Sequence, residues 1–176
     1  MPGGAGGYGT RGSLVKRFFW LFVTLVGGVL VLDQVTKALV SAALRLHESR
    51  PVIPGFLSLT LVHNTGAAFG ILAGGRSPLR TGLFLVVSVV AMAVVLWLLW
   101  RLRPEQKVEA VALSLVFGGA VGNVIDRVRF GKVIDFVDLF YRSYHWPAFN
   151  VADAAISVGV FLLFWCLIVR KDPPAE

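Results

Sequence analysis

The stretch LRTGLFLVVSVVAMAVVLWLLW, residues 79–100, carries no charged side chain after Arg80. A helix needs about 20 mostly apolar residues to cross a hydrocarbon core of about 30 Å, and this stretch has that length. Three further stretches are also long and apolar enough to cross a membrane, although the first is interrupted by Asp33 and Lys37; they lie at residues 18–44, 108–128 and 151–169. The sequence therefore predicts four membrane-spanning helices.

The composition of the chain agrees with this prediction. Of its 176 residues, 56% are hydrophobic and 15% are charged, whereas soluble domains usually contain about 45–50% apolar and about 25% charged residues. Residues 1–12 are Gly-rich and aperiodic, so we expect a disordered tail there. Residues 13–171 are predicted to form a single membrane domain, followed by a short tail at residues 172–176.

The first apolar stretch has an alternative interpretation as a cleaved signal peptide, because Lys16 and Arg17 precede it. Small residues suited to cleavage occur only around residues 41–43, beyond the charges of Asp33 and Lys37. We therefore expect this stretch to be retained as a helix.

The net charge of +7 comes from Lys and Arg residues that lie between the apolar stretches. This pattern is typical of residues that flank membrane helices, and it does not indicate a nucleic-acid-binding face. Basic residues are densest before the first stretch, between the second and third, and after the fourth. Both termini are therefore predicted to lie in the cytoplasm.

The two connections on the opposite side, residues 45–78 and 129–150, hold most of the remaining sequence. The segment FLSLTLVHN at residues 56–64 alternates between apolar and polar side chains, which predicts a strand. The second connection is rich in aromatic residues, which favour the membrane–water interface. The predicted fold class is an all-α membrane protein, a four-transmembrane-helix bundle with a small extracytoplasmic β-sheet and an interfacial segment.

Polar residues from separate stretches fall at one predicted depth, near the extracytoplasmic ends of the helices. An ionisable residue inside a membrane costs about 2.5–3.5 kcal/mol on insertion scales and usually marks function. The residues at this level are Asp33, Asn64, Asn123, Asp126, Arg127, Asp135, Asn150 and Asp153.

Several of these residues also have a purely structural interpretation. Asp33 and Lys37 are i, i+4 partners that either neutralise each other or support a site. Asp126 suits an ion pair with another helix at least as well as it suits chemistry. Asn150 and Asp153 have the spacing of a helix capping box.

Two pairs of glycines indicate close approach of the backbone. Gly118 and Gly122 form a GxxxG pattern, which usually means close packing of helices in lipid. Gly66 and Gly70, in NTGAAFG, allow the backbone to come close either to a neighbouring helix or to an extended peptide.

The remaining inventory points to carboxylate chemistry. The sequence contains no Ser-His-Asp arrangement, no HExxH zinc motif and no glycine-rich phosphate loop. Two carboxyl groups that approach each other share a proton, so that one acts as a general base while the other polarises a carbonyl. A zinc protease is therefore not expected.

Five motifs in order resemble those of the bacterial lipoprotein signal peptidases, the signal peptidase II family. The resemblance covers most of residues 18–169, and it is specific because of the number and order of the motifs. They are DQVTK at 33–37, HNTGAAFG at 63–70, GGAVGNVIDR at 118–127, GKVIDFVD at 131–138 and PAFNVADAAI at 147–156.

The resemblance implies an aspartic endopeptidase that removes signal peptides from diacylglyceryl-modified prolipoproteins, cleaving before the lipidated cysteine. It implies Asp135 and Asp153 as the catalytic pair, with Asp138 as the local rival, and it implies that no metal ion or organic cofactor is needed. It also implies a bacterial cytoplasmic membrane location with the site on the extracytoplasmic face, and contacts with membrane phospholipids. Residues implied to bind substrate or support the pair are Asp33, Lys37, Asn64, Gly66, Asn123, Arg127 and Asn150.

Two other classes of function remain as alternatives. A proton-coupled transporter or channel subunit would use Asp33, Asp126 and Asp153 as a relay, but a relay should place acids at several depths. A scaffold subunit would use the GxxxG pattern for assembly, and it leaves the surroundings of Asp135 unexplained.

Overall fold

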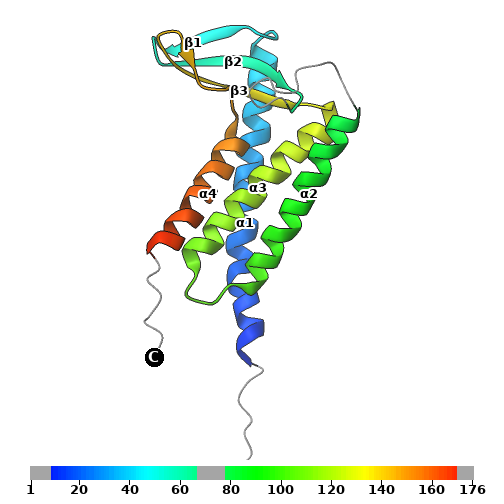
Figure 1. Ribbon diagram of the computed structural model, residues 1–176, viewed down its shortest axis with the longest axis vertical. Helices are drawn as coiled ribbons and strands as arrows, with labels where there is room; N and C mark the ends of the chain where they lie inside the picture. The colour runs from blue at the N-terminus through cyan, green and yellow to red at the C-terminus, as the bar shows by residue number, and fades with distance from the viewer. Residues whose placement is uncertain (1–8, 67–77, 170–176) are drawn as a thin grey trace, which may run out of the picture.

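The computed structural model describes residues 9–66 and 78–169, arranged as four long helices capped at one end by a small sheet (Figure 1). In chain order the elements are α1 (Gly9–Ala43), β1 (Ser49–Ile53), β2 (Leu57–Asn64), α2 (Pro78–Arg101), α3 (Lys107–Phe130), β3 (Val133–Tyr141), β4 (Tyr144–His145) and α4 (Val151–Val169).

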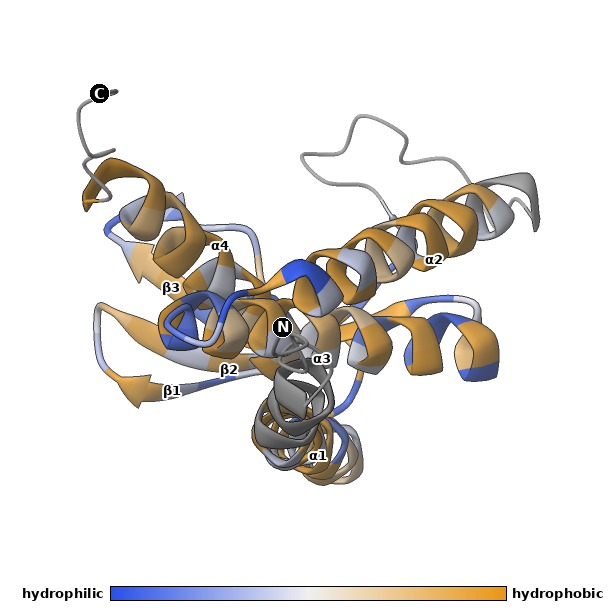
Figure 2. Ribbon diagram, turned by 90° about the horizontal axis from the view of Figure 1, so that it is seen from below, coloured by the Kyte–Doolittle hydropathy of each residue, from blue (hydrophilic) through white to orange (hydrophobic). Residues whose placement is uncertain are grey.

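Each of the four helices contains an apolar segment long enough to cross a membrane, as the sequence predicts. The helices expose many large hydrophobic side chains, among them Leu167 and Trp100. Figure 2, seen along the bundle, shows that the helices are mainly hydrophobic. A helix that is apolar on all sides suits a lipid environment. Helix α1 begins at Gly9, within the segment that the sequence predicts to be a disordered tail.

Helix α3 is the most buried of the four membrane segments and packs against α1, α2 and α4. The predicted close approach at its GxxxG pattern is confirmed. A Cβ added at Gly118 would lie 3.1 Å from Cβ of Val29 on α1. A Cβ added at Gly122 would lie 2.7 Å from Oδ2 of Asp33. Gly122 thus leaves the space that the Asp33 carboxylate occupies between the helices.

The four strands form one antiparallel sheet in the order β1-β2-β3-β4. The predicted strand is β2, and it begins one residue later than expected, at Leu57. Under the sheet, Val40 and Leu44 of α1 pack with Leu61, Ile134 and Phe136. This small core holds β2 and β3 against the end of α1.

The aromatic connection at residues 129–150 forms β3 and β4, which join the same sheet as β2. Helix α3 ends at Phe130 and is capped by Gly131, whose φ of 70° is the left-handed conformation that favours glycine. The chain then reverses directly into β3 and pairs with β2, with Val62 opposite Asp135. The turn after α3 therefore places Asp135 over the end of the bundle.

Candidate active site

Asp135 and Asp153 come from different elements at the end of the bundle that carries the sheet. Asp135 lies on β3 and has an exposed fraction of only 1%. Asp153 lies in the first turn of α4. Burial, together with the neighbouring negative charge of Asp153, raises the pKa of Asp135 to about 6. Hydrogen bonds from two asparagines oppose this rise but do not cancel it.

Asn150 connects the two aspartates directly. Its Nδ2 donates to Oδ1 of Asp135 at 2.7 Å, and its Oδ1 accepts the backbone N–H of Asp153 at 2.9 Å. Oδ2 of Asp153 in turn accepts the backbone N–H of Asn150 at 3.3 Å, which completes a capping box at the start of α4. Asn150 therefore both caps α4 and hydrogen-bonds to Asp135, through different atoms of one side chain.

Asn64 and Gly66 approach Asp135 from the end of β2. Nδ2 of Asn64 donates to Oδ2 of Asp135 at 3.0 Å, and Oδ1 of Asn64 accepts the backbone N–H of Gly66 at 2.8 Å. Gly66 has a φ of 100°, and a Cβ at this position would overlap the ring of Phe84 on α2. Glycine is thus required here for both conformation and space. Gly70 lies outside the described residues.

Asn123 and Arg127 reach the site from α3. Nδ2 of Asn123 donates to Oδ1 of Asp153 at 2.8 Å. Arg127 donates to the backbone oxygen of Asn123 at 3.3 Å, and its guanidinium lies 5.5 Å from the centroid of the Phe84 ring. Its positive charge interacts with Asp135 and Asp153. The arrangement places one cation beside two acids.

Asp33 and Lys37 pair with each other across 2.8 Å, but they do not simply neutralise one another. Nζ of Lys37 lies 2.8 Å from Oδ2 of Asp126 and donates to Oδ1 of Asn123 at 3.2 Å. The expected ion pair between Asp126 and another helix is therefore present. Lys37 connects α1 to α3 through both acidic and amide oxygens.

Asp138 is not part of this group. It pairs with His145 of the edge strand β4 across 2.9 Å. Asp138 comes three positions after Asp135 along β3, so the two side chains point to opposite faces of the strand. Among the described residues no group of His, Cys, Asp or Glu has the arrangement of a metal site.

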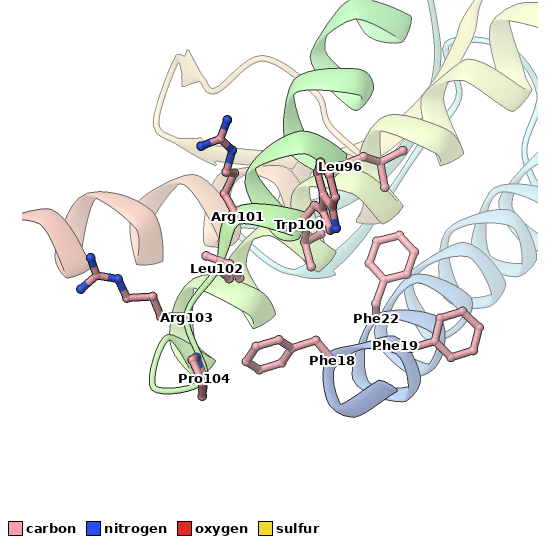
Figure 3. Close-up of a pocket in the computed structure, with 10 residues that line it drawn as sticks. Phe18, Phe19, Phe22, Leu96, Trp100, Arg101, Leu102, Arg103 and Pro104 are labelled. Carbon is pink, nitrogen blue, oxygen red and sulfur yellow. The ribbon is translucent and has the colours of Figure 1, made fainter. Parts of the chain in front are cut away.

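An apolar groove of about 740 Å³ lies at the other end of the bundle and does not contain the acids. Phe18 and Phe22 of α1 face Leu96 and Trp100 of α2 across it, and Arg101 lies at its edge (Figure 3). Aromatic and basic residues at a helix end are typical of the membrane–water interface. Asp135 and Asp153 therefore lie at the opposite end of the bundle from this groove.

Residues that are missing from the predicted site set are Gln34, Asp126 and Phe84. Asp126 carried a signal, since it is an acid inside a membrane helix, but the sequence left its role open. Gln34 is a neutral amide beside Asp33 and carried no distinguishing signal. Phe84 lies in a uniformly apolar stretch, so only the three-dimensional contact with Gly66 reveals it.

Residues 25–169 match the family model described as signal peptidase (SPase) II. The chain is similar to the lipoprotein signal peptidase of Geobacter sulfurreducens, with 50% identity over 149 residues, covering 85% of this chain and 92% of the relative. It is also similar to the lipoprotein signal peptidase of Syntrophus aciditrophicus, with 47% identity over 157 residues, covering 89% and 98% of the two chains.

Two solved structures described as bacterial membrane enzymes share the fold. The first has a TM-score of 0.78 and 32% identity, over 90% of this chain and 96% of the other. The second has a TM-score of 0.76 and 33% identity, over 88% and 96%.

Proposed function

Since the chain belongs to the signal peptidase II family, we propose that Asp135 and Asp153 are its catalytic pair. The protein is a membrane aspartic endopeptidase that removes signal peptides from lipoprotein precursors. The observation that carries the assignment of the pair is the position of Asn150, which hydrogen-bonds to both acids. No relative described above is a transporter, and the acids gather at one end of the bundle.

The surroundings of the two acids suit them to different roles. Asp153 accepts hydrogen bonds from Asn123 and from the backbone of Asn150, at the N-terminus of α4. A helix N-terminus stabilises negative charge, so we assign Asp153 the role of general base. Asp135 is more deeply buried and its pKa is raised, so it is the acid that takes up the proton shared by the pair.

This assignment gives each acid a role in hydrolysis. Asp153 removes a proton from a water molecule as its oxygen forms a bond to the scissile carbonyl carbon. Asp135 donates its proton to the carbonyl oxygen, which gives a tetrahedral diol. The diol then collapses, returning a proton to Asp135, while Asp153 passes its proton to the leaving nitrogen as the C–N bond breaks. Both acids thereby return to their starting states.

The asparagines and Arg127 support this chemistry without exchanging protons. Asn150 and Asn64 each hold one oxygen of Asp135, which fixes the direction of its O–H. Arg127 provides positive charge beside Asp153 and the buried Asp135. Fixed donors and charges of this kind stabilise charge that develops in the transition state.

The substrate proposed for this site is a precursor whose signal peptide is an apolar helix and whose cysteine carries a diacylglyceryl group. Such a signal peptide enters the bundle from the membrane, because the helices are apolar on their outer faces. The acyl chains remain in lipid, where each buried CH₂ contributes about 0.8 kcal/mol. Cleavage before the modified cysteine then separates the signal peptide from the lipid-modified protein.

The proposed location is the bacterial cytoplasmic membrane, with both termini in the cytoplasm and the catalytic pair on the extracytoplasmic face. The distribution of Lys and Arg supports this orientation. Basic residues on the sheet side, such as Arg45 and Arg142, are proposed to contact phospholipid head groups.

A cleavage assay tests the proposed substrate. The purified protein is incubated with one precursor in two forms, with and without the diacylglyceryl group on its cysteine, and release of the signal peptide is followed. We expect cleavage of the modified form and at least a tenfold lower rate for the unmodified form. Equal rates for both forms would contradict recognition of the lipid, while leaving the catalytic pair to be tested by substitution.

A further inference from the structure

Two buried acids outside the catalytic pair each hold the backbone that leads into a catalytic residue. Oδ2 of Asp126 accepts the backbone N–H of Ile134 at 3.1 Å, and Oδ1 of Asp33 accepts the backbone N–H of Ala152 at 3.0 Å. Ile134 directly precedes Asp135, and Ala152 directly precedes Asp153. Each acid therefore fixes a peptide group one residue from a carboxyl group that reacts.

The two acids are joined to each other by two side chains of α1. Nζ of Lys37 lies 2.8 Å from Oδ2 of Asp33 and 2.8 Å from Oδ2 of Asp126. Nε2 of Gln34 donates to the same two acids, at 3.1 Å to Asp33 and 3.0 Å to Asp126. The third donor of Lys37 goes to Asn123, so the ammonium group is fully used.

From this geometry we propose that Asp126 is a positioning residue for Asp135, and that Asp126, Asp33, Lys37 and Gln34 form a clamp that sets the spacing of the catalytic pair. The inference rests on the proposed catalytic roles of Asp135 and Asp153. None of the four clamp residues exchanges a proton with the substrate. They act through the backbone of β3 and α4.

Stability alone does not explain why charged groups are used here. Asp33, Lys37 and Asp126 have exposed fractions of 0%, 2% and 1%. Replacing a buried ion pair with well-packed apolar residues is often neutral or stabilising, so such a pair is weak evidence for stability. A carboxylate has two oxygens that accept a backbone N–H and an ammonium group together, and thus it links two segments with a fixed direction.

The packing around the clamp agrees with a positioning role. Gly122 on α3 leaves room for Oδ2 of Asp33, and every buried polar side-chain atom of the described residues has a hydrogen-bond partner. The clamp also reaches the pair by a second route, since Asn123 accepts from Lys37 and donates to Asp153. Displacement of a reacting group by about 1 Å can lower a rate about 10²-fold, so small changes in the clamp should be measurable.

The test measures kcat and KM for cleavage of the lipidated precursor by the full chain and by variants at position 126. Asp126→Ala removes the acceptor for Ile134, and kcat should fall at least 100-fold while KM changes less than threefold. Asp126→Asn keeps one acceptor oxygen, and Gln34 can turn its amide to match, so kcat should recover to within tenfold of the unsubstituted protein. Asp138→Ala, on the same strand but outside the clamp, should leave both constants unchanged.

A purely structural role gives a different pattern. It would lower the amount of folded protein, measured by thermal unfolding and elution profile, without changing kcat per folded molecule. Unchanged kcat in folded Asp126→Ala would therefore overturn the clamp. If Asp126→Ala does not fold, the test uses Asp126→Asn instead. A kcat of Asp126→Asn as low as that of Asp153→Asn would show that the hydrogen-bond acceptor at position 126 does not act by positioning alone. That result would overturn the inference.

A coupled substitution tests the link between the two acids. If Lys37 acts through Asp126, the loss of kcat in the double variant Lys37→Met, Asp126→Ala should be much smaller than the product of the losses in the two single variants. Fully multiplicative losses would overturn the clamp. These results are distinguishable from failure of the catalytic assignment, in which Asp135→Asn or Asp153→Asn would retain turnover.

Discussion

Nδ2 of Asn150 lies 2.7 Å from Oδ1 of Asp135, while the other end of the same amide caps the helix that carries Asp153. One side chain thus uses its acceptor to cap the helix, while its amide nitrogen donates to Asp135, to Asn123 and to the backbone oxygen of Ile134. Asn is the residue that suits both tasks, since serine and aspartate provide the cap but lack the paired N–H donors.

Substitution of Asn150 separates these two tasks. Asn150→Asp keeps the cap and places a third carboxylate beside the pair, so we expect a folded protein with turnover reduced about 10²-fold or more. Asn150→Ser should be impaired less. Asn150→Ala should lose about 0.5–2 kcal/mol of stability with the cap. Thermal unfolding is compared with turnover for all three variants. If turnover simply follows stability, and Asn150→Asp is as active as the unsubstituted protein, Asn150 acts only as a helix cap.

The raised pKa of Asp135 predicts a dependence of stability on pH. Its pKa is about 6 in the folded protein against 3.8 for the unperturbed group. Between these values the unfolded chain loses its proton first, so the free energy of unfolding falls as pH rises from about 4 to about 6, by about 3 kcal/mol in total. Above that window the contribution is constant.

The control for this prediction is Asp135→Asn, which has no proton to lose at this position. The difference between the unfolding midpoints of the unsubstituted protein and of Asp135→Asn should change by several degrees between pH 4 and pH 6.5. Asp138→Asn should behave like the unsubstituted protein. A difference that stays constant across this range would contradict burial as the cause of the shift.

The contact between Gly66 and Phe84 predicts a size-dependent effect on turnover. Gly66→Ala forces a Cβ into the Phe84 ring and also strains a residue with a φ of 100°. Because Gly66 holds Asn64, and Asn64 holds Asp135, we expect turnover to fall at least tenfold. Adding Phe84→Ala removes the overlap but not the strain, so it should restore turnover in part. Full activity in Gly66→Ala alone would show that this segment does not position Asn64.

The distribution of basic residues predicts the topology. Reporter fusions after Arg103 and after Lys171 should give cytoplasmic signals, and a fusion near Arg142, in the turn between β3 and β4, should give an extracytoplasmic signal. A cytoplasmic signal near Arg142 would place the aspartates on the wrong side for processing an exported precursor.

The membrane helices were predictable because length and apolar content alone define them. Helices α2 and α3 match the predicted stretches to within two residues at each end. The start of α1 at Gly9 was not predictable, because the helical residues before the apolar stretch carry no hydrophobic signal. Strand β3 was missed because its aromatic residues also fit an interface, and only pairing with β2 reveals a strand.

The site was predictable to the extent that charge inside a membrane is conspicuous. Because the chain leaves the membrane at the end of α3 and re-enters it with α4 on the same side, Asp153 is predicted to lie near the end of α3. The depth of Asp33 follows from its distance along α1. The partners of each polar atom were not predictable, because they depend on rotation of the helices about their axes. Gln34 and the backbone bonds at Ile134 and Ala152 belong to this class.

The rate of signal-peptide release from a lipidated precursor by Asp135→Asn, Asp153→Asn and Asp138→Asn tests the central claim most directly. Each of the three substitutions replaces a carboxyl group with an amide of similar shape, and the first and third lie on the same strand. We expect the first two to lower the rate at least about 10³-fold in folded protein, and the third to leave it near that of the unsubstituted protein. Near-normal release by Asp135→Asn or Asp153→Asn, with Asp138→Asn inactive, would contradict the assignment of the catalytic pair.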